Sequence, residues 1–213
     1  MIKPMDVLHR FVGTSDKTIR SALKEKLNQV HRGEEHYTII EELGLTHGTA
    51  RVDMVVVNGS IHGYELKSDL DTLQRLPDQM KIYNSVLDKM TLVVGKTHLH
   101  EAIRLIPDWW GVMIAKPENQ KVSLMTLREA SDNPDKSSLA IAQLLWRNEA
   151  LGILEELEAA EGLRSKPRHL IYQRLIETIG DQESLCDRVR TRLFERFSQE
   201  GWRVDRQLLQ DDD

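Results

Sequence analysis

The sequence predicts an α/β fold in which a small mixed sheet is flanked by helices and followed by a C-terminal helical region. Short runs rich in β-branched residues alternate with segments of helical period over roughly the first 130 residues. After residue 137 the helical period continues and no strand pattern appears. Hydrophobic residues make up 40% of the 213 residues and charged residues 30%, proportions typical of a folded globular chain.

The N-terminal part predicts one helix and three consecutive strands. Apolar side chains recur at helical spacing at Ile19, Leu23 and Leu27. With Thr14 or Ser15 as the capping residue, they predict a helix over residues 16–30. The sequence RGEE ends this helix, and HYTIIEEL and ARVDMVVV then have the composition of strands. The tripeptide NGS (58–60) predicts a tight turn into a third strand, IHGYELKS.

A helix, a strand, a second helix and a strand pair follow. The segment DLDTLQRLPDQMKIYNSVLD has a helical period, and it predicts a helix that is capped by Asp69 or Asp71 and kinked at Pro77. KMTLVVGK predicts a strand, and HLHEAIRLIP predicts a short helix that ends at Pro107. WWGVMIAKP and KVSLMTLR predict two further strands.

The change of pattern divides the chain into a core of residues 1–130 and a helical region of residues 136–213. The connecting sequence SDNPDK begins at Ser131 and has the polar, proline-containing composition of a boundary. Three helical segments follow it: SSLAIAQLLWRNEALGILEELEAAEGL, SKPRHLIYQRLIETI and DQESLCDRVRTRLFERFSQEGW.

Composition and charge exclude several classes of protein. The net charge is −5 and the pI is about 5.9, so there is no global basic field of the kind that marks many nucleic-acid binders. The single cysteine, Cys186, excludes an intrachain disulfide and a cysteine-based zinc site, and its helical context is typical of a core residue. Without a signal-peptide pattern or a run of about 20 apolar residues, the chain is expected in the cytoplasm and not in a membrane.

Three charged residues lie in the hairpin of residues 50–69. If its turn has three residues, Asp53 falls opposite Glu65, and the alternation of side chains places Asp53, Glu65 and Lys67 on one face. A two-residue turn would send Asp53 to the other face. Two opposed carboxylates repel unless a cation lies between them, and hard oxygen ligands suit Mg²⁺ or Mn²⁺. Lys67 suits a group that activates a metal-bound water or stabilises charge on a phosphate.

The preceding strand offers candidates for a third acid. Glu41 and Glu42 lie at the end of that strand, level with the start of the next, and Glu42 is the favoured metal ligand. Glu25, on the first helix, is a weaker candidate. A solvated acidic rim would account for the same acids without a metal.

The hairpin resembles a known nuclease motif. Asp53, eleven further residues and the tripeptide ELK (65–67) resemble the D-x(n)-(D/E)-x-K core of the PD-(D/E)XK nuclease superfamily. The stretch GYELKSDLDTLQRLPDQ, within residues 41–111, looks like that of small, mostly uncharacterised bacterial members of this superfamily. The resemblance implies a restriction-endonuclease-like core of helix, three-strand meander, helix and strand. Val52 stands before Asp53, where the name of the superfamily places a proline.

The resemblance also implies roles for individual residues. Asp53 and Glu65 would be metal ligands, and Lys67 would be the catalytic lysine. Gln79 and Tyr83 match a Q-x-x-x-Y helix motif of the exonuclease-like branch, in which the glutamine supports the site or contacts substrate. Their spacing places both on one helix face. There Tyr83 either binds substrate or packs in the core.

Several arginines are candidates for contact with phosphate. Arg75 lies one turn before the glutamine of this helix motif. Arg188, Arg192 and Arg196 share one face of the last helix and predict a phosphate-facing stripe. For all four, a solvated helix face is the alternative.

Together these features predict a metal-dependent nuclease that hydrolyses phosphodiester bonds, with DNA as the expected substrate. One alternative is a catalytically degenerate nuclease fold that binds nucleic acid or assembles with protein. Another is a protein–protein module in which Lys67 neutralises Asp53 and Glu65. A homodimer and a partner protein from a neighbouring gene are further partners that the sequence leaves open, as it leaves open DNA or RNA and endo- or exonucleolytic cutting.

Overall fold

The computed structural model describes residues 13–118 and 121–198, which form a mixed α/β fold around one sheet. The six strands lie in the order β1-β2-β3-β4-β5-β6. Their bounds are Thr38–Leu45, Ala50–Val57, Ile61–Lys67, Lys89–Gly95, Gly111–Glu118 and Lys121–Arg128. Strands β1 to β3 form an antiparallel meander, β4 and β5 continue it in parallel, and β6 returns antiparallel. The predicted mixed α/β class and the predicted order of elements through β6 are thereby confirmed.

The hairpin of β2 and β3 has the predicted register. Strand β2 ends at Val57 and β3 begins at Ile61, so the turn has three residues. Met54 pairs with Tyr64, which is the register that brings Asp53 level with Glu65. Strand pairing stops at this point, and the two strands separate just where the charged residues lie.

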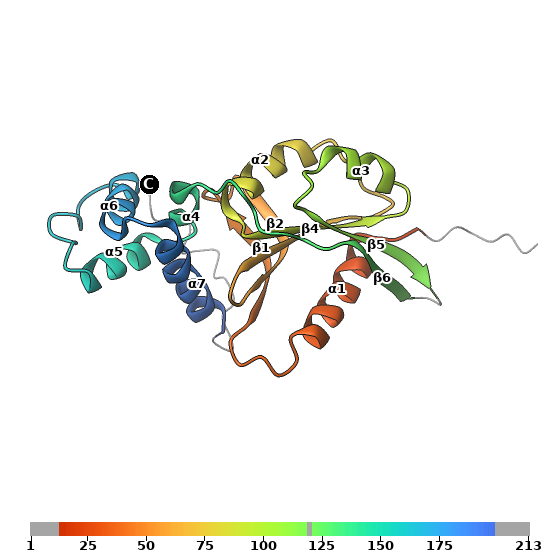
Figure 1. Cartoon of the computed structure of the whole chain (residues 1–213), viewed down its shortest axis with the longest axis horizontal. Helices are drawn as coiled ribbons and strands as arrows, with labels where there is room; N and C mark the ends of the chain where they lie inside the picture. The colour runs from red at the N-terminus through yellow and green to blue at the C-terminus, as the bar shows by residue number, and fades with distance from the viewer. Residues whose placement is uncertain (1–12, 119–120, 199–213) are drawn as a thin grey trace, which may run out of the picture.

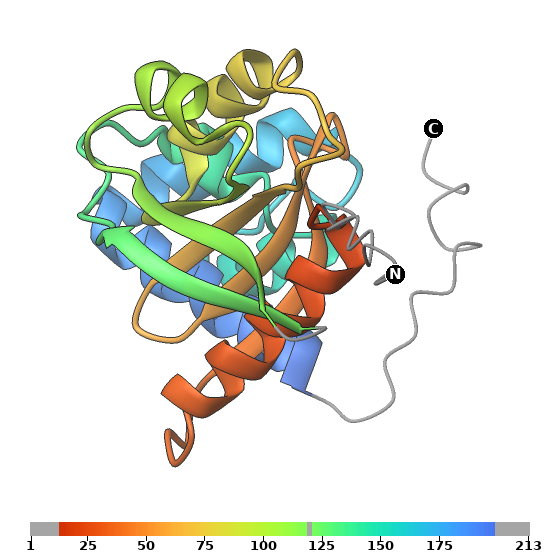
Figure 2. The same ribbon diagram turned by 90° about the vertical axis from the view of Figure 1, so that its right-hand side faces the viewer.

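Helices cover both faces of the sheet, as Figures 1 and 2 show. Helix α1 (Asp16–Val30) packs on one face through its buried apolar stripe. Ser15 caps it and exchanges hydrogen bonds with Thr18. Helices α2 (Leu76–Val86) and α3 (Leu99–Leu105) cover the opposite face. The carboxyl ends of the parallel strands β3 and β4 lead through loops into α2 and α3.

The start of α2 corrects one sequence prediction. The helix begins at Leu76, so Asp69 and Asp71 do not cap it. Pro77 lies in its first turn, where a missing N–H removes no helical hydrogen bond, and it produces no kink. Residues 68–75 instead form a turn-rich connection, which the apolar spacing of that segment conceals.

The helical region contains four described helices instead of three. They are α4 (Ser138–Ala142), α5 (Arg147–Glu156), α6 (Arg168–Ile179) and α7 (Gln182–Ser198). The first predicted helix divides because Trp146 begins a new helix, with its N–H bonded to Glu149 at 2.7 Å. These helices lie at the β1 end of the sheet (Figure 1) and share one apolar core with it. The buried Cys186 belongs to that core, as predicted.

Asp88, immediately before β4, connects the helical region to the sheet. Its carboxylate accepts hydrogen bonds from the backbone N–H of Ile61 at 2.7 Å and from Arg190 of α7 at 3.3 Å. Lys136 completes the cluster from the connecting segment. Within the described residues, no helix combines the length and the apolar character needed to cross a membrane.

Candidate active site

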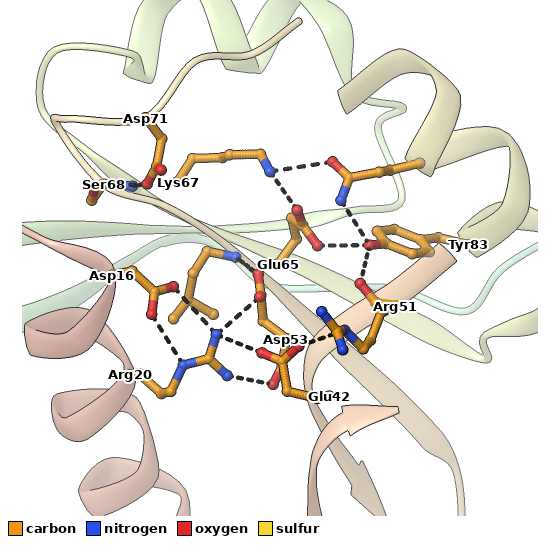
Figure 3. Close-up of polar contacts among 12 residues, drawn as sticks. Asp16, Arg20, Glu42, Arg51, Asp53, Glu65, Lys67, Ser68, Asp71 and Tyr83 are labelled. Atoms are coloured by element: carbon orange, nitrogen blue, oxygen red, sulfur yellow. Dashed lines mark hydrogen bonds and ion pairs between the residues drawn. The ribbon is translucent and has the colours of Figure 1, made fainter. Parts of the chain in front are cut away.

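A connected polar network joins β2, β3 and α2 at the point where β2 and β3 separate (Figure 3). Glu65 and Lys67 project from β3 toward α2. The Lys67 ammonium donates to Glu65 Oε1 at 2.5 Å and to Gln79 Oε1 at 3.2 Å. The structure thus brings Glu65, Lys67 and Gln79 together, although Gln79 lies twelve residues beyond Lys67 along the chain.

Tyr83 links this network to β2. Its hydroxyl lies 2.8 Å from both Glu65 Oε2 and the carbonyl oxygen of Arg51, and it accepts a hydrogen bond from Gln79 at 3.1 Å. Burial, followed by the negative charge of Glu65, raises the pKa of Tyr83, so the hydroxyl remains a donor. Because Tyr83 is fully buried, it orients Glu65 and has no surface for the substrate contact that the sequence suggested.

Glu65 is a buried acid whose pKa is raised by some of its surroundings and lowered by others. Its side chain is only 1% exposed, and this burial raises the pKa of Glu65. The negative charge of Asp53 raises it further, while Lys67 and Tyr83 act in the opposite direction. The net effect is a raised pKa of Glu65, with burial as its main cause.

Asp53 lies in the gap between the separating strands. One carboxylate oxygen accepts the backbone N–H of Leu66 at 2.8 Å, in place of a strand partner. The other accepts from Arg20 at 3.0 Å, and Arg20 also donates to the Asp53 carbonyl at 2.8 Å. Arg20 comes from α1, on the other face of the sheet. Asp53 is therefore paired with a side chain of α1, whereas Glu65 and Lys67 are bonded to side chains of α2.

Arg20 is the site residue that sequence reasoning missed. It contacts three acids: Asp16 one turn earlier in α1, Asp53 on β2 and Glu42 on β1. The four-residue spacing of Asp16 and Arg20 was visible in the sequence. The sequence does not show, however, which strands this face of α1 contacts.

Glu42 belongs to the network through arginines. The β1–β2 ladder pairs Glu41 with Met54 and Leu43 with Val52 but lacks the pair between them, and Glu42 has a φ of 59°. Its carboxylate lies 2.9 Å from Arg20 and 2.7 Å from Arg51. The other two candidate acids lie elsewhere, since Glu41 pairs with Lys24 at 2.6 Å and Glu25 contacts Gln29 on α1.

The donor set fits a divalent cation in one respect and not in another. Asp53 and Glu65 supply hard oxygen ligands, and Mg²⁺ commonly uses one or two carboxylates together with waters and substrate phosphate. The connected side chains hold four carboxylates and three cations, which leaves one excess negative charge. However, no group of three potential metal ligands occurs among residues 13–118 and 121–198. Asp53 and Glu65 have the ligand chemistry that such an ion prefers, whereas Glu42 is paired with Arg20 and Arg51.

The arginines of the α7 stripe form ion pairs with acidic side chains. Arg188 lies 3.4 Å from Glu156, and Arg192 lies 2.8 Å from Glu195 and also contacts Glu156. Arg196 forms an ion pair with Glu149 of α5. These pairs hold α7 against α5, so the prediction of an open phosphate-facing stripe is wrong. Arg75, in contrast, is exposed at the start of α2, near the network.

A braced turn follows Lys67. The N–H of Asp71 donates to the carbonyl of Ser68 at 3.2 Å, and the Asp71 carboxylate accepts the Ser68 N–H at 2.7 Å. The Asp69 carboxylate accepts the backbone N–H and hydroxyl of both Thr14 and Thr97 at 2.8–3.0 Å. Neither acid has the predicted capping role: Asp71 closes the turn, and Asp69 fixes it to the segments before α1 and after β4.

Asp69→Asn is expected to remove an acid-sensitive part of the stability. Burial alone would raise the pKa of Asp69, but hydrogen bonds from Thr97 and Thr14 lower it to about 2, against an ordinary 3.8. Because the folded pKa is depressed, this stabilisation is present above pH 3.8 and is lost as the pH falls toward about 2. Urea unfolding across this range should show a shallower acid dependence for Asp69→Asn than for wild type.

Asp78→Asn is the matched control for this prediction, because the Asp78 side chain is 82% exposed and pairs only with Lys81. The Asp78→Asn variant should show the same pH dependence of the free energy of unfolding as wild type. If Asp69→Asn also shows this pH dependence, the role assigned to Asp69 is contradicted.

Comparison with known proteins identifies relatives of this chain. A family model described as "Bacteriophage P4 protein cII" matches residues 12–210. "Protein cII" of Enterobacteria phage P4 is 32% identical over 92 residues, which cover 43% of this chain and 35% of that protein. The aligned part therefore spans about a third of the length of this relative. No solved structure matches the chain.

Proposed function

The chain belongs to the bacteriophage P4 protein cII family, and we propose that it is a divalent-metal-dependent nuclease that hydrolyses phosphodiester bonds in DNA. The observation that carries this proposal is the network itself. Glu65, Lys67 and Gln79 are joined by hydrogen bonds, and Asp53 accepts the N–H of Leu66, the residue between Glu65 and Lys67. The order of helix, three-strand meander, helix and strand supports a restriction-endonuclease-like core. The expected location of this activity is the cytoplasm.

Each residue of the network has a distinct task in this proposal. Asp53 and Glu65 would hold the ion, which when bound polarises the phosphate and lowers the pKa of a coordinated water. Lys67 carries a positive charge beside Glu65, placed to stabilise the charge that develops on the phosphate. Gln79 restrains the Lys67 ammonium, and Tyr83 restrains the Glu65 carboxylate. Both act through their neighbours and are positioning residues.

A second candidate function rests on a different observation. In this structure every carboxylate oxygen of Asp53 and Glu65 already has a hydrogen-bond partner. Such closed pairing favours a degenerate nuclease fold that binds nucleic acid or assembles with protein. The intact set of acid, acid and lysine favours the enzyme, because an assembly surface has no need of charges buried this deeply.

A substrate panel separates the two functions. Purified protein would be incubated with linear duplex, supercoiled circle, single-stranded DNA and RNA, each in Mg²⁺, Mn²⁺ or EDTA. The nuclease proposal predicts cutting of a DNA substrate that EDTA abolishes. DNA binding without cutting under any of these conditions would contradict it and favour the binding module.

A further inference from the structure

One nitrogen of the Arg20 guanidinium has more acidic neighbours than it has hydrogens. Its Nη2 atom donates to Asp53 Oδ1 at 3.0 Å and to Asp16 Oδ1 at 3.2 Å, which uses both hydrogens of that nitrogen. Glu42 Oε1 lies 2.9 Å from the same nitrogen and is a third acceptor. Arg20 can therefore lose one of these three acids without leaving an N–H unpaired.

The three acids differ in their relation to the candidate metal site. Asp53 is one of the two proposed ligands and is the least exposed of the three, at 21% against 40% for Glu42 and 50% for Asp16. Its ion pair with Arg20 is therefore the least screened by solvent. Asp16 and Glu42 are not proposed ligands, so they can pair with Arg20 whether or not an ion is bound.

The backbone of β1 places Glu42 beside the guanidinium. Glu42 has a φ of 59°, a left-handed conformation that is uncommon for a residue with a side chain, and the strand ladder lacks the pair between Glu42 and Asp53. Arg20 Nη1 donates to the Asp53 carbonyl in this gap at 2.8 Å. Figure 3 shows Asp16 and Glu42 both directed toward Arg20, from α1 and from β1. Strain of this kind commonly occurs at functional sites.

We infer that Arg20 competes with the divalent ion for Asp53, and that Asp16 and Glu42 retain Arg20 when the ion is bound. This inference rests on the proposed nuclease function and concerns the regulation of its metal site. A cation that must be displaced lowers the affinity of the site, and an acid that accepts the displaced cation reduces this cost. Arg20 and Glu42 therefore change the ion affinity in opposite directions, although neither is a ligand.

Titration of Mn²⁺ followed by electron paramagnetic resonance tests the competition without any cutting. Arg20→Gln should bind Mn²⁺ about tenfold more tightly than wild type. Arg20→Lys should have an intermediate affinity, because lysine keeps the charge but lacks the planar fork of donors. Lys24→Gln is the matched control, since it removes one positive charge from the next turn of α1 and pairs with Glu41 instead of the network. It should bind Mn²⁺ as wild type does.

Glu42→Gln is expected to have the opposite effect. Without this acceptor Arg20 should pair more strongly with Asp53, so the affinity for Mn²⁺ should fall about fivefold. Glu41→Gln controls for the loss of one negative charge from the same strand. In the Arg20→Gln background, Glu42→Gln should change the affinity no more than Glu41→Gln does. A larger loss in that background would make Glu42 a direct ligand and overturn the inference.

The outcomes for Arg20→Gln separate this inference from the proposed function. If wild type binds Mn²⁺ and Arg20→Gln binds it equally or more weakly, the competition is refuted and Arg20 only holds Asp53 in place, while the nuclease proposal stands. If neither protein binds Mn²⁺, both proposals fall. The predicted order of affinities without cutting of any DNA would support the competition and contradict the nuclease function.

Discussion

Glu65→Gln is expected to reduce metal-dependent cleavage by about 100-fold or more. The substitution keeps the size of the side chain and its contacts with Lys67 and Tyr83, but it removes one of the two negative charges that would hold the ion. Metal ions contribute several kcal/mol to the stabilisation of a phosphoryl transition state, and each 1.36 kcal/mol is a factor of ten in rate. Single-turnover cleavage of the preferred DNA measures this directly.

Glu41→Gln is the matched control for the cleavage prediction. Glu41 is an acid of the adjacent strand β1, and it pairs with the exposed Lys24 instead of joining the network. Its variant should cleave within about twofold of wild type, because exposed ion pairs contribute little. Cleavage by Glu65→Gln at the rate of Glu41→Gln would show that the buried acid has no part in catalysis.

Lys67→Met is expected to destabilise the fold by about 3–5 kcal/mol, and adding Glu65→Gln should restore much of that loss. The single change leaves the Glu65 carboxylate buried with no cation in contact. Its pKa, already raised by burial, must rise further, so the variant should gain stability as the pH falls. The double variant removes both charges. Urea unfolding at two pH values measures the coupling between Lys67 and Glu65.

The exposed pair of Lys24 and Glu41 provides the reference for this comparison of single and double variants. Its side chains are 53% and 38% exposed, so Lys24→Met should change stability by less than about 1 kcal/mol at either pH. Additive losses in Lys67→Met and Glu65→Gln would mean that the two charges do not depend on each other.

The hairpin that carries the network was predictable because local rules determine it. The NGS turn sets the register of β2 and β3, and that register brings Asp53 level with Glu65. The i, i+4 spacing of Gln79 and Tyr83 likewise placed both residues on one helix face, from which Gln79 contacts Lys67 and Tyr83 contacts Glu65. The buried position of Cys186 followed from its place in an apolar helical pattern.

What the sequence concealed depends on contacts between distant segments. Arg20 reaches Asp53 across 33 residues, and only the packing of α1 on the sheet brings them together. The arginines of α7 matched a phosphate-binding stripe because their spacing is right, but the acids of α5 that neutralise them lie more than 30 residues away. Asp69 and Asp71 are residue types that commonly cap helices, yet Asp69 accepts hydrogen bonds from Thr14 and Thr97 within a turn.

We expect Asp53 and Glu65 to exchange Arg20 and Lys67, the cations that now pair with them, for a divalent ion. Electron paramagnetic resonance of Mn²⁺, titrated with wild type and with Asp53→Asn, measures this most directly. Wild type should show a bound Mn²⁺ population that Asp53→Asn loses and Glu41→Gln retains. Equal Mn²⁺ binding in all three proteins, or none, would show that the charges form a permanent salt-bridge network.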